Sequence, residues 1–176
     1  GFPKELHQAL AKDGWLGVAM PEEFGGAGLG ITEAAVMMQA IAESGAGFSG
    51  ASAVHMNIFG LNPVVVFGNE SQKQRMLPPL IAGTERACFA VTEPNTGLDT
   101  KNIKTQAVKK GKKYLVTGQK VWISTAQLAE KILLLTKTTT GLTLFYTDFD
   151  RKYIEVREIE KMGRKAVDSN QVFFDG

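Results

Sequence analysis

The segment at residues 89–99, Phe-Ala-Val-Thr-Glu-Pro-Asn-Thr-Gly-Leu-Asp, contains residue types that could bind a ligand. An apolar stretch runs into a tight loop that contains Pro94, Asn95 and Gly97. Such a loop can present backbone N–H groups to an anion, and Thr92 adds a hydroxyl beside apolar neighbours. Because Pro, Asn and Gly also dominate ordinary turns, composition alone favours a surface turn between two strands.

A second segment pairs an aromatic ring with a hydroxyl. Residues 118–125 read Gly-Gln-Lys-Val-Trp-Ile-Ser-Thr. The two-residue period of a strand predicts that Trp122 and Ser124 lie on the same face. A planar ring beside a hydroxyl could hold a flat heterocycle by packing and one hydrogen bond. The alternative without a ligand is a core tryptophan beside a solvated serine.

Other candidate sites lack the spacing that their chemistry requires. The glycine-rich loop at residues 25–30 has no G-x-G-x-x-G pattern, which argues against a dinucleotide site and favours close helix packing or a substrate-side wall. His7 and His55 have no Cys or His at ligand spacing, so we expect no metal site and interpret His55 as a hydrogen-bonded core residue. Cys88 lies in an apolar run and is interpreted as inert packing.

Composition and charge restrict the possible partners. The chain has 20 Lys and Arg against 18 Asp and Glu, and its formal charge of +2 gives no electrostatic reason to expect nucleic acid. No apolar run approaches the ~20 residues that a membrane-spanning helix needs, so we expect no membrane span. A single cysteine excludes a disulfide within the chain and fits a reducing compartment.

Helical patterns fill the first half of the chain. Phe2, Leu6 and Leu10 repeat at four-residue spacing, and Thr32 is predicted to cap a second helix. Residues 51–67 predict a buried helix interrupted near Pro63. Residues 71–74 have the S-x-x-Q form of a capping box, and the helix that they open is predicted to break or restart at the two prolines 78 and 79.

The second half changes to strand patterns separated by turn signals. The predicted strands cover residues 87–91, 114–118, 121–123, 132–135, 142–146, 154–156 and 172–174. The sequence therefore predicts an α+β fold, with an N-terminal all-helical domain at residues 1–85 and an antiparallel β-sandwich or barrel domain at residues 86–176. The last residues read as a strand running into a turn, and we expect that this chain lacks residues beyond them.

Four stretches resemble the acyl-CoA dehydrogenase family in the family's own order, over nearly the whole chain. Residues 89–99 are similar to the first signature of the family, and residues 118–124 to its second flavin-contacting strand. Residues 14–26 resemble the loop near the N-terminus of the family. Residues 161–164 and 168–169 resemble the stretch before the last β-domain strands. These co-linear matches favour a ligand site at the first two segments over the turn and core alternatives.

The resemblance implies an N-terminal α-domain, a middle β-domain and a C-terminal four-helix domain that this chain lacks. In the family, FAD lies between the β-domain and the C-terminal helices. Carried over by position, the residues along the flavin would be Phe89, Val91, Thr92, Trp122, Ile123 and Ser124. The hydroxyls of Thr92 and Ser124 would hydrogen-bond the edge of the ring.

The sequence departs from the family pattern at two of these positions. Leu98 stands where the family commonly has a Ser that contacts cofactor or substrate, so only the backbone N–H of Leu98 could make that contact. Ser124 stands where the family often has Thr, and this change keeps the hydroxyl.

The resemblance also implies the reaction, an oxidation of an acyl-CoA thioester to the trans-2-enoyl-CoA. A carboxylate base removes the α-proton, the flavin accepts hydride from the β-carbon, and an electron-transfer flavoprotein takes the electrons. Donors to the thioester carbonyl must stabilise the developing charge. In the family the base is a Glu of the C-terminal domain, so we assign no catalytic residue here. We expect the chain alone to be inactive and to bind FAD weakly.

Two alternatives to this function stay open. One is an acyl-CoA oxidase or a nitroalkane oxidase-like flavoenzyme on the same fold, and the other is a non-enzymatic interaction module. The family implies fatty-acid β-oxidation, a homodimer or homotetramer at full length, and a bacterial cytoplasm or a mitochondrial matrix. The predicted buried helix around Met56, Phe59 and Leu61 could contribute to the depth of an acyl pocket.

Overall fold

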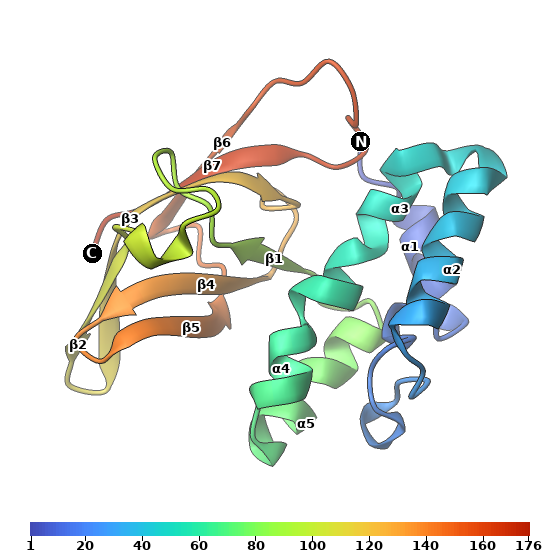
Figure 1. The fold of residues 1–176 in the computed structure, drawn as a ribbon, viewed down its shortest axis with the longest axis horizontal. Helices are drawn as coiled ribbons and strands as arrows, with labels where there is room; N and C mark the ends of the chain where they lie inside the picture. The colour runs from blue at the N-terminus through green and yellow to red at the C-terminus, as the bar shows by residue number, and fades with distance from the viewer. The chain divides into compact units, whose positions relative to one another are not determined.

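In the computed structural model, which describes residues 1–176, the chain divides into two compact units (Figure 1). The first unit comprises Gly1–Ala87 and Met162–Val167, and the second comprises Cys88–Lys161 and Asp168–Gly176. The first is helical and the second contains the β-sheet. This arrangement confirms the predicted α+β class, with helices before strands.

Five α-helices form the first unit: α1 (Lys4–Lys12), α2 (Ile31–Ile41), α3 (Gly47–His55), α4 (Asn62–Phe67) and α5 (Glu70–Ile81). Leu6 and Leu10 of α1 pack against a buried apolar cluster, as their four-residue spacing predicts. That cluster contains Leu16, Val18, Ala34, Met37, Ile41, Val54 and Ile58.

The start of α2 differs from the prediction. Thr32 was expected to be the N-cap, but the helix begins at Ile31 and Gly30 precedes it. The Glu33 carboxylate accepts a hydrogen bond from the Gly30 N–H at 2.9 Å. The acidic side chain three residues after the cap therefore fixes the first turn, and no hydroxyl at the cap is needed.

The predicted capping box of α5 is also displaced by two residues. Asn69 and Gln72 form it: the Gln72 N–H donates to Asn69 Oδ1 and the Asn69 N–H donates to Gln72 Oε1, both at 2.9 Å. Asn is as good an N-cap as Ser, so the sequence contains two overlapping candidates for the capping box of this helix. The predicted box at Ser71 and Gln74 is therefore wrong.

The predicted break of α5 at its two prolines is wrong as well, since the helix continues to Ile81. Pro78 and Pro79 remove the hydrogen bonds that would reach the carbonyls of Gln74 and Arg75. Those two residues are exposed, so water can satisfy their carbonyl groups. Leu77 and Leu80, which are buried, hold this part of the helix against its unit.

The predicted helix over residues 51–67 forms in pieces, with α3 and α4 joined by a wide turn at Met56–Gly60 and Pro63 in the first turn of α4. By length and composition alone, Ile31–Phe67 could cross a membrane. This is weak evidence for a span, because 56% of its most apolar window is buried within the chain, as in the core helix of a soluble protein. Gly45, at φ 94°, also interrupts it.

The glycine-rich loop packs closely against the chain just before it, and not between helices as one of its two interpretations predicted. A Cβ added at Gly26 would lie 2.1 Å from the carbonyl oxygen of Met20. The Gly28 N–H donates to the same oxygen at 2.8 Å. Gly26 is therefore required for this approach of one backbone segment to another.

The second unit is a seven-stranded sheet in the order β1-β4-β2-β3-β7-β6, with β5 paired to β4. Its strands are β1 (Ala87–Ala90), β2 (Gln106–Lys110), β3 (Lys113–Ser124), β4 (Lys131–Thr138), β5 (Gly141–Asp148), β6 (Ile154–Glu158) and β7 (Ser169–Phe174). The pairs β2–β3, β3–β7, β4–β5 and β6–β7 are antiparallel.

One pair departs from the predicted antiparallel sheet: β2 and β4 are parallel, with Gln106 opposite Lys137. The strand β3 lies on the other side of β2, so the chain crosses over before β4 joins. The sheet is therefore mixed. Local turn signals could not predict this pair, because it joins strands that are not consecutive in sequence.

The core of the second unit lies on the sheet and includes Cys88, Ile123 and Val172. Cys88 is fully buried, and burial raises the pKa of its thiol far above the ordinary value. A thiol that stays protonated is a poor nucleophile. This agrees with the interpretation of Cys88 as inert packing.

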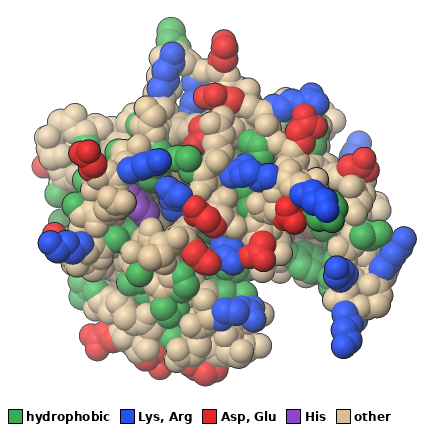
Figure 2. Space-filling view, turned by 180° about the vertical axis from the view of Figure 1, so that it is seen from behind, with side chains coloured by type: hydrophobic (Ala, Val, Ile, Leu, Met, Phe, Trp, Pro, Cys, Tyr) green, Lys and Arg blue, Asp and Glu red, His purple; other side chains and the backbone are tan.

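Charged side chains of both signs are interspersed on the face of the molecule shown in Figure 2. That face carries no broad field of a single sign, in keeping with the near-balanced composition.

Candidate functional site

The loop that follows β1 has the tight turn expected from its sequence. Glu93 and Thr96 exchange two backbone hydrogen bonds, each 3.0 Å long, around Pro94 and Asn95. The side chains of Val91 and Thr92, just before the turn, are half-buried. We call residues 91–96 the Thr92 loop.

The Thr92 loop lies beside β3, so the structure brings the two predicted segments together. The Val121 N–H donates to the Thr92 carbonyl oxygen at 2.9 Å. The ammonium of Lys120 donates to the Val91 carbonyl oxygen, also at 2.9 Å. These two bonds hold the residues before Trp122 against the residues around Thr92.

A buried ion pair anchors the same loop. Lys120 Nζ lies 2.9 Å from Glu93 Oε1, and the two side chains are 0% and 6% exposed. Glu93 also accepts hydrogen bonds from the backbone N–H groups of Lys104, at 2.6 Å, and Thr105, at 2.9 Å. Every charge in this buried site therefore has a close partner.

The hydrogen bonds around Glu93 decide its ionisation. Burial raises the pKa of this carboxyl group, but hydrogen bonds from Thr105, Lys104 and Lys120 outweigh burial and lower the pKa to about 2. Burial lowers the pKa of Lys120, while Glu93 opposes that effect. The folded loop thus stabilises the ionised carboxylate form of Glu93.

Trp122 occupies a strained bulge of β3. Its φ is +63°, and the pairing with β7 shifts register between Lys120 and Ile123. A positive φ is unfavourable for a bulky residue, and a bulge re-aims side chains. The indole is 60% exposed despite its size. Backbone strain that exposes an aromatic ring is typical of a binding position.

The residues after Trp122 alternate between the core and the opposite side. Ile123 is 2% exposed within the core cluster, whereas Ser124 is half-buried and pairs with Ser169 on β7. Only the backbone of Ile123 could therefore face a ligand. Its carbonyl oxygen accepts a hydrogen bond from Asn170 Nδ2 at 2.9 Å, which fixes the chain just after the bulge.

The other two predicted site residues lie differently. Phe89, on β1, is half-buried. Leu98 is fully exposed beyond the turn, and its carbonyl oxygen accepts a hydrogen bond from the Thr100 N–H at 3.0 Å. The Leu98 side chain thus makes little contact within the chain.

Val91, Thr92, Trp122 and Ser124 lie on these two adjacent segments and remain candidates for binding a planar ligand. Trp122 offers an exposed ring, and Thr92 and Ser124 supply hydroxyls from neighbouring segments. Such a combination can hold a flat heterocycle by packing and by hydrogen bonds to its edge. No group of three or more His, Cys, Asp or Glu side chains in the chain could hold a metal ion.

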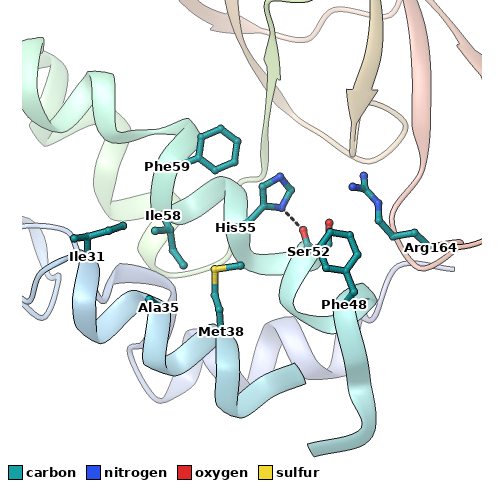
Figure 3. Close-up of a pocket in the computed structure, with 9 residues that line it drawn as sticks. All are labelled: Ile31, Ala35, Met38, Phe48, Ser52, His55, Ile58, Phe59 and Arg164. Atoms are coloured by element: carbon teal, nitrogen blue, oxygen red, sulfur yellow. Dashed lines mark hydrogen bonds between the residues drawn. The ribbon is translucent and has the colours of Figure 1, made fainter. Parts of the chain in front are cut away.

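A separate cavity of about 350 Å³ lies within the helical unit (Figure 3). It opens between α2 and α3, and the loop Met162–Val167 contributes one residue to its wall. The lining residues are Ile31, Ala35, Met38, Phe48, Ser52, His55, Ile58, Phe59 and Arg164. Most of this surface is apolar.

His55 is held in place inside this cavity. Its Nδ1–H donates to the Ser52 carbonyl oxygen, and its ring stacks on Phe59 with centroids 5.1 Å apart (Figure 3). Burial lowers the pKa of His55, and the nearby positive charge of Arg164 lowers it further. The predicted hydrogen bond of His55 is therefore confirmed, but the predicted place in the core is wrong, because the residue is half-buried and lines a cavity.

Reasoning from the sequence assigned no role to Glu93, Lys120, Asn170 or Arg164. Glu93 lies in residues 89–99 and Lys120 in residues 118–125. A charged residue beside apolar strand residues could have indicated a buried ion pair. No local pattern marks Asn170 or Arg164, because their contacts are with residues distant in sequence.

Family models match both parts of the chain. Residues 1–84 match the acyl-CoA dehydrogenase N-terminal domain, and residues 88–176 match the acyl-CoA dehydrogenase middle domain. Similar curated proteins include an acyl-CoA dehydrogenase of Bacillus subtilis, 31% identical over 99% of this chain and 47% of the relative. Another is the mitochondrial isovaleryl-CoA dehydrogenase of Pongo abelii, 29% identical over 98% of this chain and 42% of the relative.

Solved structures agree with these matches. A probable acyl-CoA dehydrogenase of Mycobacterium abscessus superimposes with a TM-score of 0.91 at 29% identity, over 99% of this chain and 48% of that one. An acyl-CoA dehydrogenase of Bacillus anthracis complexed with FAD has a TM-score of 0.87 at 28% identity, over 97% of this chain and 30% of that one. The chain thus spans about half the length of the curated relatives it matches.

Proposed function

The chain belongs to the acyl-CoA dehydrogenase family, and we propose that it supplies the flavin-binding surface and part of the acyl pocket of an FAD-dependent enzyme. The reaction is the oxidation of an acyl-CoA thioester to the trans-2-enoyl-CoA. The observation that carries this proposal is the hydrogen bond between Val121 and Thr92, which joins the two flavin-type segments into one surface.

Each residue of this surface has a distinct role toward the flavin. The Trp122 indole packs on the ring system, and Val91 and Phe89 give it apolar neighbours. The hydroxyls of Thr92 and Ser124 donate hydrogen bonds to the edge of the ring. When bound, FAD supplies the hydride acceptor for the β-carbon of the substrate.

The backbone completes the flavin surface at the other two positions. Ile123 presents only its main chain, since its side chain is buried in the core. Leu98 offers its backbone N–H to cofactor or substrate in place of a serine hydroxyl.

The helical cavity takes the acyl tail in this proposal. Its apolar lining favours a hydrocarbon chain. Of the three predicted pocket residues, Phe59 contributes to its wall, whereas Met56 and Leu61 are buried and do not line it. The reaction also needs a carboxylate base on the side of the substrate opposite the flavin. We assign that role to no residue of this chain and place it, as in the family, in a C-terminal domain.

We assign residues 1–85 to the N-terminal helical domain and residues 86–176 to the middle β-domain. The division of contacts at Ala87 and Cys88 supports this boundary, although Met162–Val167 associates with the helical unit. At full length we propose a homodimer or homotetramer that passes electrons to an electron-transfer flavoprotein. Bacterial and mitochondrial relatives support either a bacterial cytoplasm or a mitochondrial matrix.

The test uses the protein that contains this chain, purified and loaded with FAD. Saturated acyl-CoA substrates are added without oxygen, and the visible flavin absorption is recorded. Loss of the oxidised flavin band with formation of enoyl-CoA supports the proposal. Retention of the band with acyl-CoA substrates of every length tested would exclude it. Oxygen consumption in air would instead favour an acyl-CoA oxidase.

A further inference from the structure

Two residues with strained backbones flank the dipeptide Ile123–Ser124. Trp122 before it has φ +63° and Thr125 after it has φ +62°. A positive φ is unfavourable for a bulky residue and for a β-branched one, so it persists only where surrounding contacts impose it. The contacts that hold this segment therefore decide where Trp122 and Ser124 lie.

Asn170 of β7 is the pairing partner at the end of the bulge. Two residues of β3, Val121 and Trp122, lie opposite Gln171 alone, and regular pairing resumes between Ile123 and Asn170. The extra residue of a bulge is what changes the direction of the side chains beside it. An interaction that keeps Ile123 in register with Asn170 therefore keeps the bulge at Trp122.

The Asn170 side chain supplies that interaction from a fully buried position. Its exposed fraction is 0%. Its Nδ2 donates to the Ile123 carbonyl oxygen at 2.9 Å and also to the Asp168 carboxylate. Its Oδ1 accepts a hydrogen bond from Gln127 Nε2 at 3.3 Å. Both N–H groups and the oxygen of the Asn170 amide are therefore bonded.

These bonds reach both sides of the strained segment. Ile123 lies before Ser124 and Thr125, and Gln127 lies after them, so a single side chain holds the chain at both ends. An amide suits this position because it donates two hydrogen bonds and also accepts. A carboxylate cannot donate, and a hydroxyl has only one hydrogen.

We infer that Asn170 is a positioning residue of the flavin surface, whose amide fixes the bulge so that the Trp122 ring and the Ser124 hydroxyl are in place before the flavin binds. This inference rests on the flavin surface of the proposed function. Because Asn170 is buried, it acts through these two residues and not by contact with the cofactor. Holding binding groups in place in advance lowers the entropic cost of association.

The experiment titrates FAD into the apoprotein of the enzyme that contains this chain, with two substitutions of Asn170. Asn170→Asp keeps the volume but turns carboxylate oxygens toward the Ile123 carbonyl and the Asp168 carboxylate. Asn170→Ala leaves room for a water that can donate to the same carbonyl oxygen. We expect FAD binding to weaken by at least about tenfold in Asn170→Asp and by about threefold in Asn170→Ala. A side chain that only filled space would give the opposite order.

Thr136→Val is the matched control for the loss of a buried hydrogen bond. Thr136 is also 0% exposed, its hydroxyl donates to the Thr143 carbonyl oxygen at 3.5 Å, and its strand β4 does not pair with β3. This variant should lose thermal stability but keep its FAD affinity within about twofold. Thermal unfolding identifies a temperature at which each variant is folded. If Asn170→Asp is unfolded there, Asn170→Ala is compared with Thr136→Val.

A second background tests whether Asn170 acts through the residues that it positions. In the enzyme that carries Trp122→Gly and Ser124→Ala, each Asn170 variant should weaken FAD binding by less than about twofold, because the positioned groups are gone. A merely structural role would give the same loss in both backgrounds, and that result would overturn the inference.

The outcomes separate this inference from the proposed function. If both Asn170 variants bind FAD as tightly as the unaltered enzyme, or if Asn170→Ala binds it more weakly than Asn170→Asp, the inference is wrong and the proposed function stands. If the unaltered enzyme binds FAD but no acyl-CoA reduces the flavin, the proposed reaction is wrong and the comparison still tests Asn170. If the unaltered enzyme does not bind FAD, both are wrong.

Discussion

Lys120 and Glu93 form a buried ion pair, with 2.9 Å between Nζ and Oε1, that ties the Thr92 loop to the strand carrying Trp122. The same ammonium also holds the Val91 carbonyl oxygen. The Lys120 ammonium therefore holds the Thr92 loop in position beside β3, where the proposed flavin surface lies.

Removing one partner of this pair should destabilise the second unit strongly. Glu93→Gln leaves the buried Lys120 ammonium without its counter-charge, which we expect to cost about 3–5 kcal/mol in the free energy of unfolding. Urea denaturation of the two proteins measures this. Glu155→Gln is the matched control, because its exposed pair with Arg157 should contribute less than about 1 kcal/mol. Equal losses in the two variants would contradict the importance given to the buried pair.

The pH dependence of stability should report the same carboxyl group. The pKa of Glu93 is lowered to about 2 in the folded protein, so the unfolded chain binds more protons at mildly acidic pH. The stability that Glu93 contributes is then fully present above its unfolded pKa of about 4.3 and is lost as the pH falls from there toward 2. Unfolding midpoints measured across this range should fall less steeply for Glu93→Gln than for the unaltered protein. Parallel curves would show that Glu93 does not titrate in this way.

Trp122 should show a trade-off between stability and binding. Trp122→Gly relieves the positive φ and should stabilise the flavin-free protein by about 1 kcal/mol, because glycine adopts this conformation without strain. It should also weaken FAD binding by at least about tenfold through loss of the packing surface. Thermal unfolding and a flavin titration measure the two effects. Tyr114→Gly is the control from the same strand, and it should destabilise without changing the flavin affinity. Loss of stability in Trp122→Gly would refute the proposed strain.

Gly26 should be intolerant of even a methyl group. Gly26→Ala places a Cβ 2.1 Å from the Met20 carbonyl oxygen, so the loop must move, and we expect a loss of about 1–3 kcal/mol. Gly97→Ala meets nothing within 4 Å and should be close to neutral. Thermal unfolding of the two variants gives the comparison, and a neutral Gly26→Ala would show that the close approach is not structural.

Much of the architecture could be predicted from local patterns. The helical and strand halves, the helix interruption near Pro63 and the tight turn after Thr92 all follow from periodicity and turn residues. The failures have physical reasons. Two capping boxes overlapped before α5, and its prolines fall where exposed carbonyl groups can bond water, so the helix persists.

The site was only partly accessible to the same reasoning. The segments containing Thr92 and Trp122 stand out by residue type, but the bulge at Trp122 has no glycine to signal it. The hydrogen bond from Val121 to Thr92, the link from Asn170 to Ile123 and the place of Arg164 in the cavity wall join residues distant in sequence. Such relationships depend on the folded sheet and helices and leave no trace in local spacing.

The most direct test of the flavin surface uses the fluorescence of Trp122. The chain has only two tryptophans, so Trp15→Phe leaves Trp122 as the single reporter. FAD is titrated into the apoprotein of the enzyme that contains this chain, with any tryptophan outside residues 1–176 also replaced by Phe. If the flavin packs on Trp122, its emission should be nearly abolished at one equivalent of bound FAD. Emission that persists while FAD binds would contradict the proposal that Trp122 and the Thr92 loop form the flavin site.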